Sequence, residues 1–213
     1  MANAPAAAIA LALCLIASSV DAAGSTAVAV CKPPANLQTM KAIGDVVRAM
    51  YPMDADPKSP EAERAADRVM AVDRHNTAQL RPWLQRCGWP SVKVHGQEVE
   101  NTVWLLVQHA DQDRPFQQFA VGLLKVRVLQ KDAPGAHLAY LADRVAVGMG
   151  RRQMYGTQVE QTGPCKVELL PVDDGALVNQ RRKEAGLNSL DAYMDQLRAT
   201  LLPSTCRSEG GAP

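Results

Sequence analysis

The sequence has few aromatic residues and no strong excess of charge of either sign. Phe, Trp and Tyr together make up 4% of its 213 residues, although 47% are hydrophobic, so the core must be built mainly from Leu, Val, Ala and Met. Lys and Arg number 23 against 22 Asp and Glu, a formal net charge of +1. Proteins that bind nucleic acids carry dense basic patches, and the sequence has no basic stripe, so we expect no nucleic-acid partner.

The common catalytic and cofactor-binding signatures are also absent. The sequence contains no His-Glu-x-x-His, no Gly-x-Ser-x-Gly, no Walker loop and no Gly-x-Gly-x-x-Gly. It has no Cys-x-x-Cys pair, which argues against a zinc ribbon and a thioredoxin-like redox site. His75, His95 and His137 do not have the mutual spacing of metal ligands. We therefore expect no metal ion and no cofactor.

The N-terminal segment is apolar but short. Residues 5–20 form an unbroken run of apolar and small residues, whereas a membrane-spanning helix needs about 20 strongly apolar residues. The run is typical of a secretory signal peptide, which we place at residues 1–22. The start of the chain has no Lys or Arg, which keeps two alternatives open: a lipid anchor at Cys14 or an uncleaved anchor. We expect a periplasmic or secreted protein with no stable membrane span after processing.

The cysteines support the expectation of export. Removal of the signal peptide removes Cys14 and leaves an even number for disulfide formation, which is favoured outside the cytoplasm. The remaining cysteines are Cys31, Cys87, Cys165 and Cys206. Because the two ends of a domain often lie close together, we expect the pairs Cys31–Cys206 and Cys87–Cys165. The alternative is that some of these cysteines are free buried thiols.

Hydrophobic residues recur at helical spacing through most of the remaining chain and predict a mainly α fold, a compact multi-helix orthogonal bundle. Ser59-Pro60 is a favoured start for a helix, whereas the polar residues 73–77 and Pro82 predict an interruption or a kink within it. Residues 91–97 read as a loop, and one short β-hairpin is expected near residues 152–172. We expect helices near residues 36–50, 60–87, 97–109, 115–131, 134–147, 175–185 and 190–201.

These elements fit one domain. We place a flexible N-terminal segment at residues 23–35, a single helical domain at residues 36–202 and a C-terminal tail at residues 203–213. Polar residues are concentrated at the ends of elements between residues 108 and 158, so this region is where we expect any functional site.

Two groups of polar residues lie on predicted helices. The first comprises Gln108, His109 and Asp111; a carboxylate two residues after a histidine can orient it as a general base, although both residues could instead cap helix ends. In the second group, Tyr140 shares a helical face with Asp143 and Arg144, which are expected to reach different partners. Arg144 could bind a carboxylate or phosphate and Tyr140 could donate a proton; an inter-helix ion-pair network is the alternative.

The third group lies in the predicted hairpin region. It offers hydrogen-bond donors and acceptors but no strong base, which suits ligand recognition better than proton transfer. Gly156 indicates a bulge or a close backbone approach. The alternative is a hairpin edge packed against the helices. The candidate residues are Gln153, Tyr155, Gly156, Thr157 and Gln158.

The ordered set of motifs resembles a widespread bacterial family of unknown function that has the pattern QHAD…YLxDRV…QxYGTQ. The resemblance covers residues 69–197 and implies a shared polar pocket but no particular reaction. Gly88-Trp89-Pro90 and Phe116-Gln117 match it as well, and so do Arg181-Arg182, Gly186-Leu187 and Tyr193 in its tail. The chain departs from the common form in its N-terminal extension and in Pro82.

Two functions are compatible with these residues. In the first, the protein binds or hydrolyses a small molecule in one polar pocket. His109 and Asp111 would form the base pair, Arg144 and Tyr140 would hold the substrate, and the other wall would comprise Gln108, Gln117, Asp143 and residues 153–158. In the second, the protein is a non-catalytic periplasmic protein-binding or immunity-type protein; the same residues would then be buried and mutually bonded, with an apolar patch elsewhere.

Overall fold

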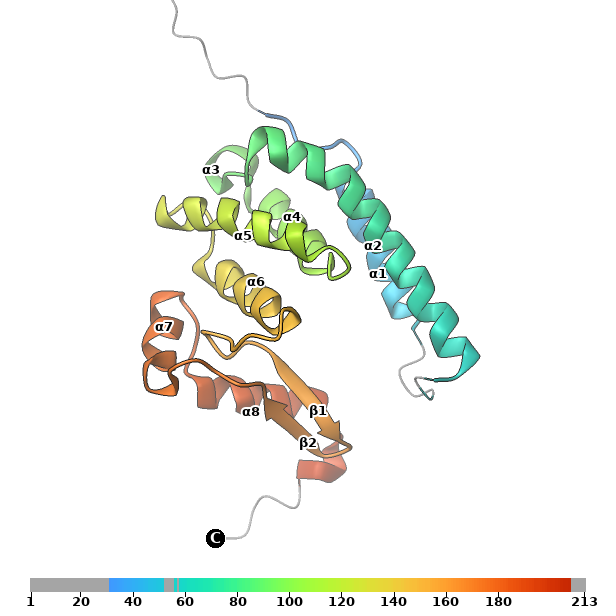
Figure 1. Cartoon of the computed structure of the whole chain (residues 1–213), viewed down its shortest axis with the longest axis vertical. Helices are drawn as coiled ribbons and strands as arrows, with labels where there is room; N and C mark the ends of the chain where they lie inside the picture. Colours follow the sequence, from blue (N-terminus) through green and yellow to red (C-terminus); the bar gives the residue numbers. More distant parts are fainter. Residues whose placement is uncertain (1–30, 52–55, 57, 208–213) are drawn as a thin grey trace, which may run out of the picture. The chain divides into compact units, whose positions relative to one another are not determined.

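A computed structural model of the chain describes residues 31–51, 56 and 58–207 (Figure 1). The predicted signal peptide, including Cys14, lies outside the described residues. The described part is mainly α-helical with one two-stranded antiparallel sheet, which confirms the predicted fold class. No helix in this part is both long and apolar enough to cross a membrane.

The helices follow one another with short connections. In chain order they are α1 (Leu37–Ala49), α2 (Pro60–Cys87), α3 (Val92–His95), α4 (Gln97–Gln108), α5 (Arg114–Leu129), α6 (Gly135–Gly148), the 3-10 turn η1 (Gly175–Leu177), α7 (Val178–Glu184), α8 (Leu190–Leu201) and the 3-10 turn η2 (Ser204–Arg207). The segment expected to be a loop at residues 91–97 contains α3. Its N-cap is Ser91, whose hydroxyl accepts a hydrogen bond from the Val94 amide at 3.1 Å.

Helix α2 is continuous, so the predicted interruption is wrong. Its buried polar residues have partners and do not break the helix: the Asn76 side chain donates to the Met40 carbonyl of α1 at 3.2 Å, and the Thr77 hydroxyl donates to the Asp73 carbonyl within α2 at 2.7 Å. Pro82 lies inside the helix and removes a backbone donor. The neighbouring side chains Leu80, Trp83 and Leu84 are buried, and this tertiary packing compensates for the lost hydrogen bond.

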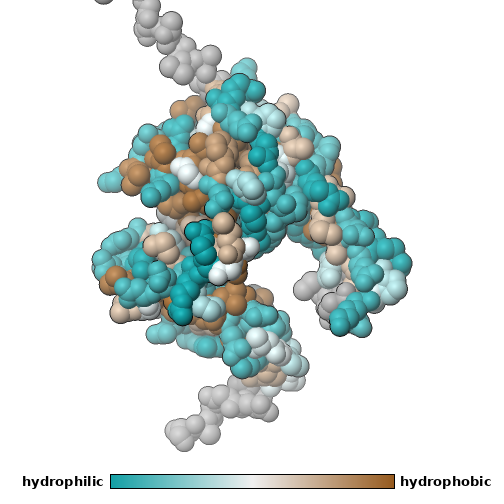
Figure 2. Space-filling view, viewed as in Figure 1, coloured by the Kyte–Doolittle hydropathy of each residue, from teal (hydrophilic) through white to brown (hydrophobic). Residues whose placement is uncertain are grey.

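The main core lies among α1, α2, α4, α5 and α6. Most of its side chains are aliphatic, as expected from the shortage of aromatic residues, and Trp83, Trp89 and Phe116 are its only buried aromatic side chains among the described residues. A second, smaller cluster lies beneath the β-hairpin and includes Val167, Tyr193 and Met194. On the face shown in Figure 2, hydrophobic side chains gather over α5, whereas the visible side of α2 is mainly hydrophilic.

The predicted hairpin is present with narrower bounds. Strand β1 (Val159–Gly163) pairs antiparallel with β2 (Lys166–Leu169). The register is irregular between Gln161 and Gly163, beside the turn. The polar segment of residues 153–158 precedes β1 and forms no regular strand.

All four described cysteines form disulfides, but the expected pairing is wrong. The bonds join Cys31 to Cys87 and Cys165 to Cys206. The reason is the antiparallel packing of α1 on α2, along which Asn36 bonds Gln79 and Arg48 bonds Asp73. This packing brings the segment before α1, which carries Cys31, to the C-terminal end of α2 at Cys87. The other bond joins the turn of the hairpin to η2, which lies within the predicted C-terminal tail.

Candidate functional site

A cavity of about 570 Å³ lies beside His109, between the α1–α2 pair and the start of the α4–α5 connection. Its volume falls within the range of small-molecule pockets. Polar and charged side chains line most of it, and Val69 and Met70 add an apolar wall. The lining residues are Arg48, Tyr51, Val69, Met70, Asp73, His109, Asp111, Gln112 and Arg144.

The connection between α4 and α5 places His109 and Asp111 at this cavity. His109 is the C-cap of α4, and Ala110 is fully buried in the core. Asp113 then caps α5 by accepting a hydrogen bond from the Phe116 amide at 3.1 Å. The buried alanine and the capping aspartate fix the short segment that carries His109 and Asp111.

Asp111 is bound by arginines and not by His109. Arg144 donates to it from Nε at 2.9 Å and from Nη2, Arg114 donates from Nη1 at 2.9 Å, and the Gln117 amide donates at 3.2 Å. Burial raises the pKa of Asp111, but the hydrogen bond and charge of Arg144, with help from Gln117 and Arg114, outweigh it and keep this pKa below its usual value. Asp111 therefore stays ionised, and its charge is balanced by the guanidinium groups.

Gly148 makes room for one of these arginines. A Cβ atom at this last residue of α6 would lie 2.2 Å from Cζ of Arg114. No side chain could occupy that position without displacing the guanidinium that binds Asp111 and Gln117.

His109 differs from the other polar residues of the cavity, because its ring forms no hydrogen bond with any residue that the structure describes. Burial, followed by the positive charges of Arg48 and Arg144, lowers the pKa of His109 to about 4. The imidazole is therefore neutral at pH 7. It can accept a proton or a hydrogen bond from one nitrogen and donate from the other.

The opposite side of the cavity carries a second ion pair, between Arg48 of α1 and Asp73 of α2. Burial raises the pKa of Asp73 more than the neighbouring Arg48 lowers it. Gly44, one turn before Arg48, lets the arginine lie along α1, because a Cβ there would be 2.6 Å from Nη1 of Arg48.

Asp143 serves a different part of the molecule from its neighbour Arg144. Its two carboxylate oxygens accept hydrogen bonds from the amides of Met154, Tyr155 and Thr157 and from the Thr157 hydroxyl, at 2.7–3.1 Å. The side chain of Asp143 is 1% exposed. It fixes the backbone of the segment before β1.

The rest of this segment is also bonded internally. The buried Gln153 side chain donates to the carbonyls of Gln158 and Leu170 at 2.9 and 2.7 Å and accepts from the Gln158 amide at 2.8 Å. Gly156 has a φ of 66°, and a Cβ there would meet the Leu190 side chain at 2.9 Å. This is the close approach that the sequence indicated.

Arg182 completes this network from α7. It is fully buried, donates to the carbonyls of Tyr155 and Gly156 at 2.8 and 3.2 Å, and lies over the Tyr193 ring at 4.7 Å. Burial lowers the pKa of Arg182 and raises that of Tyr155. Tyr140 packs edge-on between Trp104 and Tyr193.

The structure thus divides the predicted site residues into two groups. His109, Asp111 and Arg144 share the cavity, with Gln117 behind Asp111 and the carbonyl of Gln108 bonded to Gln117 at 3.2 Å. The second group is not among the residues that line this cavity, because its polar groups bond one another or pack in the smaller core. It consists of Tyr140, Asp143, Gln153, Tyr155, Gly156, Thr157 and Gln158.

Sequence reasoning missed Arg48, Asp73, Arg114 and Arg182. Arg48 and Asp73 lie on different helices, and no local pattern shows that these helices pack antiparallel. Arg114 has a local signal, since it lies three residues from Asp111 and three from Gln117. Arg182 matches the family pattern, but no local signal in the sequence shows that it is buried.

The fold and the cavity define a class of protein: a disulfide-bonded, mainly α-helical domain with a cavity of arginine, aspartate and histidine side chains between its helices. The chain belongs to a family of unknown function, DUF6624, whose model matches residues 32–201. The predicted membership of a family of unknown function is confirmed at this level. No curated protein and no solved structure matches the chain.

Proposed function

We propose that the protein binds a small organic anion in the cavity beside His109. The observation that carries the proposal is the position of a neutral, unbonded imidazole between two arginines. The chemistry that this arrangement would recognise is a carboxylate or phosphate group on a small apolar body, since Val69 and Met70 form the apolar wall.

Both arginines retain donors for a ligand. Arg144 bonds Asp111 through Nε and Nη2, and Arg48 bonds Asp73 through Nη2. Nη1 of Arg144 and Nε of Arg48 form no hydrogen bond with any described residue. The aspartates hold the guanidinium groups in place, and the remaining N–H groups are available to an anion.

His109 would respond to the bound anion. A negative charge between Arg48 and Arg144 offsets the two charges that lower its pKa, so the pKa of His109 rises on binding and the site takes up a proton. Binding should therefore strengthen as the pH falls from 7 toward 5.5. The same proton acceptor could activate water for hydrolysis. In this case His109 would take a proton from the water molecule that attacks the substrate.

Isothermal titration calorimetry at pH 7.0 and 5.5 tests the proposal. The probes are benzoate, phenyl phosphate and the neutral benzamide, titrated into the full chain without its predicted signal peptide. We expect one or both anions to bind, benzamide to bind at least about tenfold more weakly, and Arg48→Gln to weaken anion binding about tenfold. His109→Gln should remove the strengthening at pH 5.5.

The matched control is Arg86→Gln, since Arg86 is exposed on the same pair of helices and lies away from the cavity. Equal binding of benzoate and benzamide would contradict the proposal, as would equal effects of the Arg48 and Arg86 variants or a lack of any anion binding. If the parent chain hydrolyses p-nitrophenyl acetate and His109→Gln does not, the cavity has a hydrolytic function as well as a binding function.

A second candidate function is protein binding, as in an immunity-type protein. Helix α1 exposes three large apolar side chains: Ile43 is 49% exposed, Val46 is 59% exposed and Met50 is 65% exposed. Residues 153–158 and Asp143 are mutually bonded, as that candidate requires. Val46→Lys should abolish capture of a specific partner from a periplasmic extract if this candidate holds, without changing the calorimetric results above.

We also propose that the protein is exported to the periplasm or secreted. Two disulfides support this location, since such bonds persist in oxidising compartments. Fractionation of expressing cells, with mass spectrometry of the mature N-terminus, tests both the location and cleavage near residue 22.

A further inference from the structure

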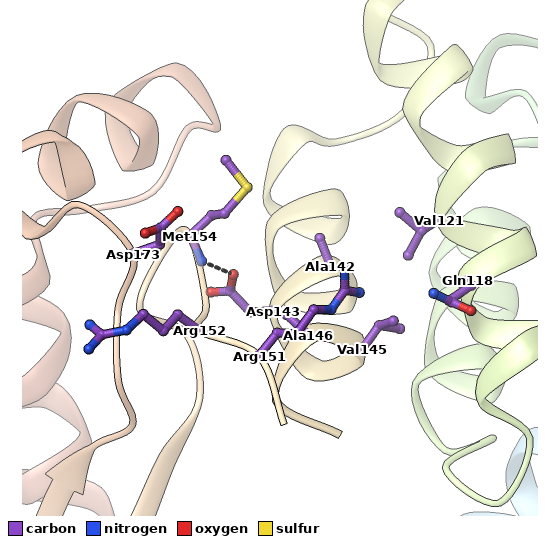
Figure 3. A pocket seen from close by; sticks show the side chains of 10 residues that line it. All are labelled: Gln118, Val121, Ala142, Asp143, Val145, Ala146, Arg151, Arg152, Met154 and Asp173. Atoms are coloured by element: carbon purple, nitrogen blue, oxygen red, sulfur yellow. Dashed lines mark hydrogen bonds between the residues drawn. The ribbon is translucent and has the colours of Figure 1, made fainter. Parts of the chain in front are cut away.

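A second cavity, of about 620 Å³, lies between α5, α6 and residues 151–154 (Figure 3). It shares no lining residue with the cavity beside His109. Its apolar part consists of Val121 from α5, of Ala142, Val145 and Ala146 from α6, and of Met154. Small side chains on α6 leave this space open.

The charge at this cavity comes from two arginines that follow α6. Neither Arg151 nor Arg152 forms an ion pair with a carboxylate of the described chain. Arg152 donates to the Val172 carbonyl at 3.0 Å, and Arg151 contacts the sulfur of Met149 at 3.3 Å. Figure 3 shows Arg151 extending along α6 beside the apolar side chains, whereas Arg152 points away from α5. Arg151 is therefore the cation that faces the apolar surface.

Two carboxylates also line the cavity, and they differ in character. Asp143 accepts hydrogen bonds from the amides of Met154, Tyr155 and Thr157, so its oxygens are already bonded within the protein. Asp173 is exposed at the rim, where water screens its charge. The combination of an apolar surface with an unpaired guanidinium beside it favours a ligand with an apolar body and a single negative group.

We propose that this cavity, whose volume lies within the range of small-molecule pockets, binds a free amphiphilic anion: an unbranched apolar chain of about eight carbons, whose methylene groups are buried on binding, that ends in a carboxylate. The chain would lie on Val121, Ala142 and Ala146, and the carboxylate would pair with Arg151. A concave site between two helices fits a monomeric amphiphile rather than a bilayer surface. This site is separate from the one proposed beside His109, so either can fail alone.

Calorimetric titration with octanoate tests the proposal, using the full chain without its predicted signal peptide and concentrations at which octanoate is monomeric. Octylamine has the same chain with the opposite charge, and butanoate keeps the carboxylate with a shorter chain. We expect octanoate to bind, with butanoate more than tenfold weaker because it buries fewer methylene groups and octylamine about tenfold weaker or worse.

Two variants locate the site. Arg151→Gln should weaken octanoate binding about tenfold without affecting folding, because Arg151 is exposed. Ala142→Leu fills the cavity and should abolish binding, provided that circular dichroism and thermal unfolding match those of the parent chain. Arg86→Gln is the control and should leave octanoate binding unchanged, because Arg86 is exposed and lines neither cavity.

Several results would overturn the proposal. They are a lack of octanoate binding, equal binding of octanoate and octylamine, and an Arg151→Gln variant that binds like the parent chain. Binding of octanoate only to vesicles or only above its micelle concentration would assign the interaction to an assembled lipid surface and would overturn it too. Binding of octanoate that is lost in Arg48→Gln but kept in Arg151→Gln would place the ligand in the other cavity.

Discussion

Asp143 and Arg144 are neighbours in α6 and have different partners. Arg144 binds Asp111 across the cavity, and Asp143 binds the backbone before β1. Helical geometry predicts this divergence, because adjacent residues point about 100° apart around the axis. The sequence does not reveal which partners they reach, since those lie on segments that only the tertiary fold brings near.

The same limit explains the different environment of His109. A carboxylate two residues away suggested that Asp111 orients His109 as a base, but Asp111 is bound by Arg114 and Arg144 instead. Arg48 is 61 positions before His109 in the chain and acts through an antiparallel helix pair that no local pattern reveals. The polar character of the site was predictable from the sequence, and its charge balance was not.

The lowered pKa of His109 makes the stability of the protein depend on pH. The unfolded chain binds a proton near pH 6.5 and the folded chain only near pH 4, so the unfolded state holds more protons between these values. Stability is highest above pH 6.5 and falls as the pH drops toward 4. We expect His109→Gln to remove this contribution, on the order of 1 kcal/mol between pH 7.5 and 5, since solvent screens part of the effect at this half-buried ring.

Urea unfolding of the parent chain and of His109→Gln at pH 7.5 and 5 measures this difference. His75→Gln is the control, because His75 is exposed on α2. Identical losses of stability in the parent chain and the His109 variant would show that the folded protein does not keep this imidazole neutral.

At the scale of elements, periodicity located most helices within two or three residues. Ser59 marked the start of α2 correctly. The error over residues 73–77 arose because polarity was taken to mean exposure. Asp73, Asn76 and Thr77 are buried but bonded, and a polar residue with a partner does not break a helix.

The segment before β1 depends on one carboxylate. An amide at position 143 has only one acceptor oxygen and would present N–H groups to N–H donors, so Asp143→Asn should cost roughly 2–4 kcal/mol of unfolding free energy. Hydrogen exchange should also accelerate at the Thr157 amide, which donates to Asp143. Urea unfolding and exchange measured by NMR check both effects.

Asp173→Asn provides the matched control, because Asp173 is exposed and close to the same segment. Its effect should stay within about 0.5 kcal/mol. If the two variants unfold alike, the hydrogen bonds of Asp143 do not determine the order of this segment.

At the scale of the whole molecule, the number of disulfides was predictable and their pairing was not. The even number of cysteines after the predicted signal peptide, together with the expected export, predicted two disulfides. Their pairing depends on which helices pack together. Each bond closes a long segment, with sequence separations of 56 and 41. Such bonds stabilise a fold largely by limiting the unfolded chain.

We expect the double variant Cys31→Ala, Cys87→Ala to lose about 2–4 kcal/mol of unfolding free energy. Thermal unfolding of this variant, compared with the parent chain under oxidising and reducing conditions, measures the loss. Reduction of Cys31–Cys87 alone should lower the melting temperature of the parent chain to that of the oxidised variant. Full reduction, which also breaks Cys165–Cys206, should lower it further. An unchanged melting temperature in the oxidised variant would show that this bond adds no stability.

The two disulfides also give the chain a simple covalent map. One disulfide closes a loop of residues 31–87 and the other closes a loop of residues 165–206, and the residues between the two loops are not enclosed by any disulfide. This intervening segment carries His109, Asp111, Asp143 and Arg144. In the unfolded, oxidised protein the two disulfide-closed loops remain closed. Refolding must therefore position the linear segment between them, and both candidate ligand sites form only when that segment folds.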